Sequence, residues 1–271
     1  MQLTSAEAAA FVAVGGAAVL LALLERRYPY NAGQPFFRTG FVTDFVWYNA
    51  VQSCVLGLFI GRLIRAVDGA TGVSRLGLLS NWPVPLALAF FLVTHDLYIY
   101  LFHRRQHYSP FLWRFHEAHH SVPQVDWLSG VRSHPVEILV NQTIEFAPIV
   151  LLAAAPDVAL WKGAMSAIWG MFIHSNLDVR LGRLQRLVNG PEMHRWHHAL
   201  DAESHWRNFA TKLALWDWLF RTAFLPDPDV RKATRYGLSD PDFPEGGPVD
   251  GWARQVVWAF RPGPPRAAGA A

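Results

Sequence analysis

Residues 115–121 read FHEAHHS, with His116, His119 and His120 in five consecutive positions and Glu117 among them. The stretch fits two patterns. The first is HExxH, a zinc-binding sequence in which two histidines hold the metal and the glutamate acts as general base. The second is HxxHH, in which every conspicuous side chain is an imidazole. The remainder of the chain decides between a protease and another kind of metal site.

The chain has the composition of a membrane protein. Of its 271 residues, 52% are hydrophobic and only 17% are charged, against about 25% in soluble proteins. The net charge of +3 is small, and the arginines are scattered between apolar segments, which does not favour nucleic-acid binding. The only cysteine, Cys54, excludes an internal disulfide and a cysteine-based metal site. Because it lies in an apolar run, we expect it in the core.

Five apolar segments predict an all-α, polytopic membrane bundle with four or five membrane segments. Each is near the roughly 20 residues that a helix needs to cross the hydrocarbon core. They occupy residues 6–25, 43–65, 83–102, 136–155 and 157–175. The first has no basic stretch ahead of it and no clean cleavage site, so we interpret it as an anchor and not as a signal peptide. Within the fourth, lipid would not solvate the polar side chains, which are expected to face the bundle or a cavity: Asn141, Gln142 and Glu145.

The placement of arginines predicts the orientation. They follow the first, third and fifth apolar segments and are absent from the N-terminal MQLTSAEA. Cytoplasmic loops carry an excess of basic residues, so we expect the N-terminus outside and these loops in the cytoplasm. Arginines on the opposite side weaken this prediction: Arg62, Arg65 and Arg75. All histidine-rich stretches then lie on one face of the membrane, where they can share a site.

The chain is expected to divide into three regions. Residues 1–82 form N-terminal membrane helices, and residues 83–222 form a histidine-box domain of membrane helices and a cytosolic helical cap. Residues 223–271 form a tail rich in Pro, Asp and Gly that is partly disordered, most of all at its end.

Eight of the twelve histidines fall in three clusters, HRRQH, HEAHH and HRWHH. Residues three or four apart on a helix share one face, so each cluster directs its imidazoles to one spot. Neutral imidazole suits iron, zinc and copper. Eight nitrogens exceed the four ligands of a tetrahedral zinc, and we therefore expect two metal ions. The candidate ligands are His103, His107, His116, His119, His120, His194, His197 and His198.

Two histidines outside the clusters are further candidate ligands. His174, in FIHSN, ends the fifth apolar segment at the depth where the third cluster begins. His134, in RSHPVE, opens the fourth segment on the same face. For His134 the alternative is a role at the start of a helix, next to Pro135 in the first turn.

Other polar residues near the clusters are expected to support them. His95, with Asp96, lies deeper in the third segment and is interpreted as a neighbour of the ligands or as part of a substrate channel. Glu117 either orients a ligating ring or is solvated. His205 is expected to form local hydrogen bonds or to support the third cluster, rather than to bind metal.

Three alternative functions fit less well. A zinc hydrolase with Glu117 as base uses only the histidines of HExxH and leaves six clustered histidines without a role. A haem protein would carry single axial histidines in facing helices. A non-catalytic metal-binding or transport protein predicts metal binding without O2 consumption and a polar path through the bundle.

Six stretches in this order resemble the sterol desaturase/fatty acid hydroxylase superfamily, in its bacterial branch, over about residues 90–222. They are HRRQH, FHEAHHS, SHPVE, FIHSN, PEMHRWHHALDAESHWRNFA and LWDWLF. The resemblance implies a membrane di-iron centre that uses O2 and external electrons to hydroxylate or desaturate an unactivated C–H position of a sterol, fatty acyl or ether lipid. It implies iron ligation by the eight clustered histidines and His174, with His134 as a tenth candidate. It implies no catalytic residue beyond the metal ligands, and zinc can replace iron in a purified sample.

Two positions depart from the family pattern. Ala210 stands where members often have glycine after Asn208 and Phe209, and Arg221 stands where they often have glycine in WDxLFGT. Neither touches the metal set, but Arg221 bears on the local geometry of the cap. Asn208 is expected to bond a ring of the third cluster or to cap a helix.

The chain contains no CxxC, GxGxxG or haem-domain pattern, so we expect a separate electron donor, a ferredoxin or cytochrome b5-like protein with its reductase. Four arginines are interpreted either as a basic face that binds an acidic electron carrier or as ordinary membrane anchors: Arg104, Arg105, Arg183 and Arg186. Aromatic residues are expected to line a lipid slot or to form an interface belt: Trp113, Phe115, Trp127, Trp169, Phe172 and Trp196. We expect a multi-pass protein of the bacterial inner membrane with its histidine boxes in the cytoplasm.

Overall fold

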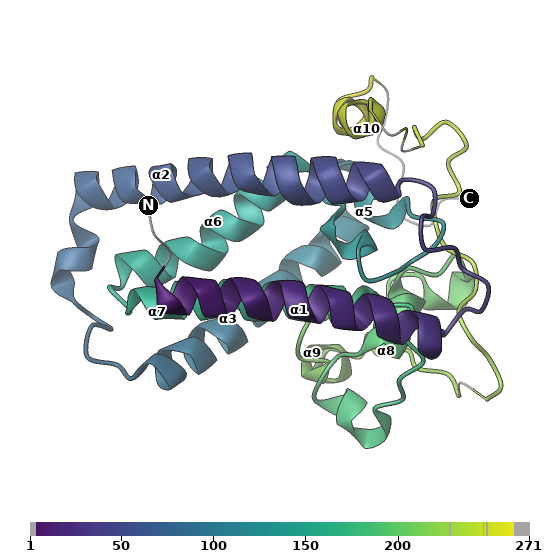
Figure 1. Cartoon of the computed structure of the whole chain (residues 1–271), viewed down its shortest axis with the longest axis horizontal. Helices are drawn as coiled ribbons and strands as arrows, with labels where there is room; N and C mark the ends of the chain where they lie inside the picture. Colours follow the sequence, from purple (N-terminus) through teal and green to yellow (C-terminus); the bar gives the residue numbers. More distant parts are fainter. Residues whose placement is uncertain (1–3, 228, 246, 248, 263–271) are drawn as a thin grey trace.

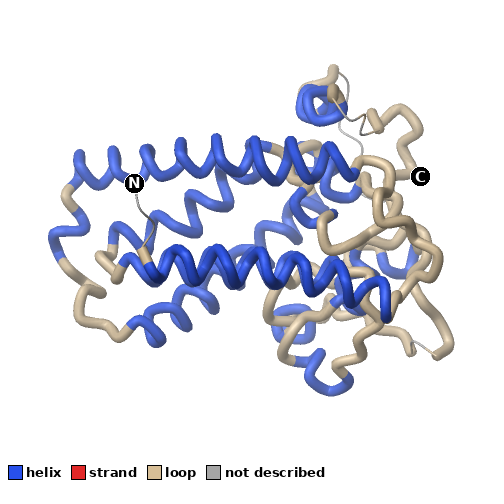
Figure 2. The backbone as a smooth tube through the Cα atoms, in the orientation of Figure 1, coloured by secondary structure: helices blue, strands red, loops and turns tan. Residues whose placement is uncertain are grey.

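The structure, a computed structural model, describes residues 4–227, 229–245, 247 and 249–262. Over these residues the chain is helical and contains no β-strand. Long helices form one end of the molecule, and short helices joined by loops form the other (Figures 1 and 2). The predicted all-α class is confirmed.

Long helices form at all five apolar segments. They are α1 (Ser5–Arg27), α2 (Ser53–Thr71), α3 (Val84–Tyr108), α6 (Pro135–Leu151) and α7 (Pro156–His174), and the π-helix η1 (Thr43–Gln52) precedes α2 without a break. Among the described residues, three helices are long and apolar enough to cross a membrane: Ser5–Arg27, Thr43–Thr71 and Val84–Tyr108. The 17 residues of α6 are at the lower limit of the range that spans a membrane, and Lys162 interrupts the apolar run of α7. The fourth and fifth crossings therefore stay predictions.

The helix pair α6–α7 packs against the other long helices of the bundle. α7 packs against α1 and α3, and α6 packs against α2 and α3. These contacts bury one charged residue of each helix, Glu145 and Lys162, as expected for polar groups at membrane depth.

The outer helices expose apolar side chains, as helices in contact with lipid do. Phe11 on α1 and Val55 on α2 are 76% and 59% exposed. Cys54 lies next to Val55 and is exposed as well. The prediction of a core cysteine was wrong, because the apolar run that contains Cys54 turns much of its surface away from the bundle.

Short helices and loops build the end that carries the histidines. Its elements are α4 (Pro110–Trp113), α5 (Glu117–His120), η3 (Ser129–Val131), η4 (Gly182–Arg186), α8 (Pro191–His197), η5 (Ala202–Ser204), α9 (Leu215–Leu219) and α10 (Gly251–Trp258). We call this end the cap. The first turn of α1 and the short helix η2 (Val73–Leu76) lie at the opposite end of the bundle (Figure 1).

Buried ion pairs tie the loops of the cap to the start of η1. Arg38 donates two hydrogen bonds to Asp126, of 2.8 and 2.9 Å, and contacts Asp44 at 2.8 Å. Asp44 also accepts hydrogen bonds of 2.7 and 3.1 Å from Arg132. Breaking one partner of such a buried pair is costly because it leaves an uncompensated charge, so the network fixes the loop that contains Arg132.

The C-terminal region folds back onto the cap. Arg261 forms an ion pair with Glu117, with two hydrogen bonds of 2.8 and 2.9 Å. Arg114 donates a 2.7 Å hydrogen bond to the Arg261 carbonyl, and the Trp252 indole donates one of 2.7 Å to Gln52. The expected disorder of the chain's end concerns residues 263–271, which lie outside the described residues.

Arg221 occupies the left-handed backbone region, with φ +60°, which costs a residue with a side chain about 1–2 kcal/mol. We expect Arg221→Gly to raise the free energy of unfolding by up to about 1 kcal/mol, because the relief of strain exceeds the added entropy of the unfolded chain. Thermal unfolding of both proteins in detergent measures this. Arg221→Ala is the matched control: it removes the side chain, keeps the strain and should give no gain. A glycine variant no more stable than the alanine variant would contradict the prediction.

Candidate metal centre

Nine of the ten predicted ligands come together in two groups, with one candidate nitrogen of each ring within 4.8 Å of the others in its group. Group one contains His103, His107, His116, His120 and His197. Group two contains His119, His174, His194 and His198. All nine are buried. The groups are adjacent, since the rings of His120 and His198 stack with their centroids 4.4 Å apart.

Four stretches of chain deliver these rings, and the three that carry more than one ring use helical spacing. His103 and His107 are one turn apart on α3, and His174 is the last residue of α7. The second and third clusters lie on or next to the short helices α5 and α8. Within one cluster, neighbouring rings go to different groups: His116 and His120 to group one, His119 to group two.

In group one, hydrogen bonds fix which nitrogen faces the centre. The Nδ1 atoms of His103 and His197 lie 2.8 Å from the carbonyl oxygens of Phe209 and Arg207, and so must carry the proton. His116 Nδ1 lies 3.0 Å from the Glu137 carboxyl group, which accepts the ring proton in its ionised form. The remaining nitrogen, Nε2, then carries a lone pair. Within the described part of the chain, Nε2 has no partner in any of the five rings, although each is buried. Five unpartnered buried ring nitrogens that converge on one point fit a metal ion.

Group two gives a second, independent test. His119 Nδ1 donates to the Arg132 carbonyl at 3.1 Å and His174 Nδ1 donates to the Gly170 carbonyl at 2.8 Å. Their Nε2 atoms therefore both present lone pairs, yet they lie 3.2 Å apart. Two lone pairs at this distance repel unless a cation lies between them.

The other Nε2–Nε2 distances of group two agree with this interpretation. From His174 they are 3.0 Å to His194 and 3.2 Å to His198, and His194 and His198 are 3.2 Å apart. Ligands about 2.0–2.1 Å from a tetrahedral metal lie about 3.3 Å from one another. The four nitrogens thus have the spacing of a metal's coordination shell.

Burial keeps the histidines of the cap neutral, which metal ligation requires. Desolvation, with the neighbouring His116, lowers the pKa of His119 to about 3. Desolvation, with the nearby His174, does the same for the pKa of His116. Burial also holds the pKa of four further rings well below the usual range: His120, His194, His197 and His198. At neutral pH these nitrogens can therefore all act as ligands.

His134 departs from the prediction that it contributes a tenth ligand. Its Nδ1 accepts a 3.1 Å hydrogen bond from the Val136 backbone N–H, which caps the start of α6, and its Nε2 lies 3.1 Å from the Val256 carbonyl. Both ring nitrogens are occupied by protein partners, and neither histidine group includes it. The structure therefore gives it the alternative role, at the start of a helix beside Pro135.

The predicted supporting residues lie in different places. Asp96 does not contact a histidine of either group; it holds the loop that follows Ala210, accepting hydrogen bonds of 2.8–3.0 Å from Thr211 Oγ1, Lys212 N, Leu213 N and Trp216 Nε1. His95 lines a cavity between α3, α6 and α7, which is called the main cavity below. His205 is partly exposed and belongs to neither group.

Glu117 and Asn208 also differ from expectation. The Glu117 carboxylate pairs with Arg261 and not with a ligating ring. Asn208 bonds backbone groups of Met193 and Phe224, so it neither contacts a ring nor caps a helix. It anchors the residue before His194, and its own backbone is left-handed, with φ +57°.

The carboxylate that does orient a ring is Glu137, which the sequence analysis missed. It is buried in the first turn of α6 and lies 3.0 Å from His116 Nδ1. A signal existed: Glu137 follows His134 by three residues in SHPVE, so the helix that begins there carries it on the face next to the cluster. Other rings are oriented by hydrogen bonds to backbone carbonyls, such as that of Arg132. The type of residue that supplies a carbonyl does not predict such a bond.

A cavity of about 250 Å³ lies between α3, α6 and α7 and reaches both histidine groups. Histidines of both line it, among them His103 and His119. Apolar residues alternate with polar ones along its walls, including Ile99, Phe102, Ile173, Asn141, Gln142 and Glu145. The expected location of these three polar residues, facing the bundle or a cavity, agrees with this lining.

Of the predicted slot aromatics, only Trp169 lines the cavity. Trp113 packs behind group one, with its ring centroid 5.0 Å from that of His107. Phe172 packs on Trp169, Trp127 lies near Glu25, and Trp196 is a core residue. Phe115 packs against His134. These side chains support the rings and loops instead of forming a slot.

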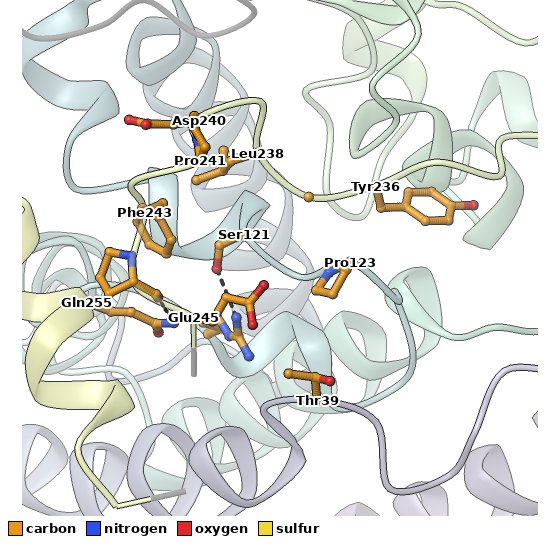
Figure 3. Close-up of a pocket in the computed structure, with 13 residues that line it drawn as sticks. Thr39, Ser121, Pro123, Tyr236, Leu238, Asp240, Pro241, Phe243, Glu245 and Gln255 are labelled. Atoms are coloured by element: carbon orange, nitrogen blue, oxygen red, sulfur yellow. Dashed lines mark hydrogen bonds between the residues drawn. The ribbon is translucent and has the colours of Figure 1, made fainter. Parts of the chain in front are cut away.

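A second cavity, of about 210 Å³, lies beside Ser121, Phe243 and Gln255 (Figure 3). Arg132 donates a 2.9 Å hydrogen bond to Ser121 in its wall, and the C-terminal stretch 236–245 forms much of its lining. No histidine lines it. The metal chemistry therefore belongs to the first cavity.

Fold and site together define a class: an integral membrane protein whose helical bundle carries, at one end, two adjacent all-histidine groups with the spacing of metal ligands. The model of the fatty acid hydroxylase family matches residues 88–222, the stretch that contains every candidate ligand. The chain belongs to the sterol desaturase/fatty acid hydroxylase superfamily.

Three relatives illustrate the match. Ornithine lipid hydroxylase OlsE from Rhizobium tropici is 34% identical over 146 residues, which are 54% of this chain and 44% of that protein. Alkylglycerol monooxygenase from Danio rerio is 32% identical over 54% of this chain and 31% of that protein. The Delta(7)-sterol 5(6)-desaturase ERG3B from Gibberella zeae is 23% identical over 63% of this chain and 52% of that protein. The chain thus matches less than half the length of the first two relatives. No solved structure matches it significantly.

Proposed function

We propose that the chain is a membrane-bound di-iron oxygenase that hydroxylates or desaturates an unactivated C–H position of a lipid, with O2 and external electrons. One observation carries the proposal: nine histidines, ready as neutral ligands, form two adjacent groups at a cavity between membrane helices. The names of the relatives, which include a lipid hydroxylase, a monooxygenase and a sterol desaturase, support the same reaction class.

Group one would hold one iron and group two the other. Bound iron would supply the activation of O2, which no side chain provides. The chain's own contribution is positional. Carbonyl groups and Glu137 hold the rings by their Nδ1 protons, and the cavity holds a lipid chain against both groups while its walls exclude water.

The zinc hydrolase alternative is disfavoured by the partner of Glu117. The Glu117 carboxylate accepts two hydrogen bonds from Arg261, one on each oxygen. The carboxylate is therefore occupied by Arg261 and does not face a metal-bound water as a general base would. The hydrolase also leaves group two without a role, since HExxH supplies ligands only to group one.

Electrons are proposed to come from a separate carrier, a ferredoxin or cytochrome b5-like protein with its reductase, on the cytoplasmic side of the bacterial inner membrane. Of the basic residues considered for such contact, Arg105, Arg183 and Arg186 are exposed at the cap. Arg104 and Arg186 also lie over the rings of Tyr108 and Trp218, which fits membrane anchoring as well as carrier binding.

Lipid profiling of a bacterial host tests the function. The host is compared with and without the chain, and with a variant that lacks a ring of each group, His107→Ala with His119→Ala. We expect one lipid class to gain one oxygen or to lose two hydrogens, and only with the intact chain. Unchanged lipids from iron-loaded protein supplied with reductant would overturn the proposal.

A further inference from the structure

One end of the main cavity carries a polar network remote from the histidine groups. Lys162 forms a buried ion pair with Glu145, which also accepts a 3.0 Å hydrogen bond from Ser166. The Lys162 ammonium lies 3.1 Å from His95 Nδ1. His95 precedes His103 by eight residues on α3, or about 12 Å along the helix axis. The cavity therefore has two ends, one at the histidine groups and one at this network.

The network fixes the tautomer of His95. An ammonium group can only donate hydrogen bonds, so His95 Nδ1 is the acceptor. In a neutral ring the proton must then be on Nε2. This nitrogen is buried and has no hydrogen-bond partner among the described residues. His95, which is 8% exposed and lines the cavity, thus presents an N–H donor without an acceptor.

Two further donors share the lining. The Trp169 indole N–H is buried and, over the described chain, has no acceptor. Lys212 lines the cavity through the loop that Asp96 holds. No hydrogen bond or ion pair of the Lys212 ammonium occurs within the described residues. Its charge acts on both members of the Glu145–Lys162 pair, which places it near the network.

No carboxylate among the described residues forms an ion pair with Lys212. Glu145 is paired with Lys162. The nearby Asp96 carboxylate, whose charge also acts on Lys162, accepts its hydrogen bonds from the loop 211–216 and not from the Lys212 ammonium. The other carboxylate that lines the cavity, Glu137, lies at the histidine end and is bonded to His116. An unpaired cation with neutral N–H donors beside it matches a ligand that accepts hydrogen bonds and carries negative charge.

We propose that this end of the cavity binds an anionic group, a carboxylate or a phosphate, of the lipid that the enzyme oxidises. Calling that lipid the substrate rests on the proposed function, whereas the anion site itself does not. Such a site would determine which carbons of the lipid react. An anion held at Lys212 and His95 places the carbons that are about one cavity length away beside the histidine groups. The His95–His103 rise gives this length as about 12 Å.

Binding of three probes with the same chain tests the site without turnover. Palmitate, hexadecyl phosphate and 1-hexadecanol are titrated against the full chain, loaded with zinc, in lipid nanodiscs. We expect palmitate, hexadecyl phosphate or both to bind at least about tenfold more tightly than the alcohol, the gain typical of a hydrogen bond to a charged group. Lys212→Met should remove that preference, Lys212→Arg should keep it, and Trp169→Phe should weaken it.

Lys232→Met is the matched control. Lys232 is paired with Asp178 at 2.7 Å and lines no part of this cavity, so its loss should leave the preference unchanged. The Lys212 ammonium forms no hydrogen bond or ion pair within the described part of the chain, so Lys212→Met should fold. Equal binding of the three probes by the wild type, or a preference that survives Lys212→Met, would overturn the site. Displacement of palmitate by inorganic phosphate at similar concentrations would show a site for a free anion and would overturn its assignment to a lipid.

The two proposals fail in different ways. If the anionic probes bind as expected but the iron-loaded, reduced protein oxidises no lipid, the function is wrong and the anion site stands. If lipids are oxidised with no dependence on their polar group, the function stands and the anion site is wrong.

Discussion

Replacing His119 by alanine is expected to remove one metal ion per chain and to abolish lipid oxidation. Group two has four candidate nitrogens, and three would remain. His119 Nε2 lies 3.2 Å from His174 Nε2, so its loss opens one side of the coordination shell. Metal analysis of purified protein and a lipid oxidation assay measure the two effects. Because oxidation is proposed to use both metals, the loss of one suffices to stop it.

Two further variants make this result specific. His107→Ala, in group one, should lose the other metal and leave group two loaded. His205→Ala changes the same residue type in the cap but lies outside both groups, so it should keep both metals. Two metals retained by His119→Ala, or metal loss in His205→Ala, would contradict the assignment.

Glu137→Gln is expected to lower metal affinity in group one, or the oxidation rate, by about 10–100-fold. The carboxylate lies 3.0 Å from His116 Nδ1, where its charge makes the ligating Nε2 more basic. Glutamine keeps the shape and a hydrogen-bonding oxygen but loses that charge. Competition with a chelator, followed by metal analysis, measures the affinity, and the group-two metal should stay bound under the same conditions.

Glu117→Gln is the matched control, since it makes the same change next to the same histidine. Its carboxylate pairs with Arg261, so this variant should keep its metals and its oxidation activity, with some loss of stability. If instead Glu117→Gln were inactive and Glu137→Gln were normal, the general-base interpretation of HExxH would be restored.

The positions of the long helices were predictable because apolar composition alone determines them. All five apolar segments are helices in the structure. The cap was not predictable in detail, because its short helices depend on individual polar contacts. Asp96, for example, holds the loop 211–216 through four hydrogen bonds, and an aspartate in an apolar helix does not reveal which loop it will hold.

The site was predictable as far as local spacing determines it. Helical periodicity brought together the rings within each cluster, and the position of His174 at a helix end placed it beside them. The division into two groups was not accessible, because His197 joins group one while its neighbour His198 joins group two. That choice depends on how α8 packs against α3 and α7. His134 lies outside both groups for a related reason: a histidine before proline at a helix start can cap the helix as readily as bind metal.

The contact between Arg261 and Glu117 joins residues 144 positions apart, and it has a consequence for biosynthesis. Ribosomes release a chain from its N-terminus onward, so the second histidine cluster emerges long before the arginine that pairs with Glu117. Until residue 261 is made, the Glu117 carboxylate lacks its cation. A chain cut short before residue 261 would carry every imidazole of both groups, yet would leave this buried carboxylate without its partner.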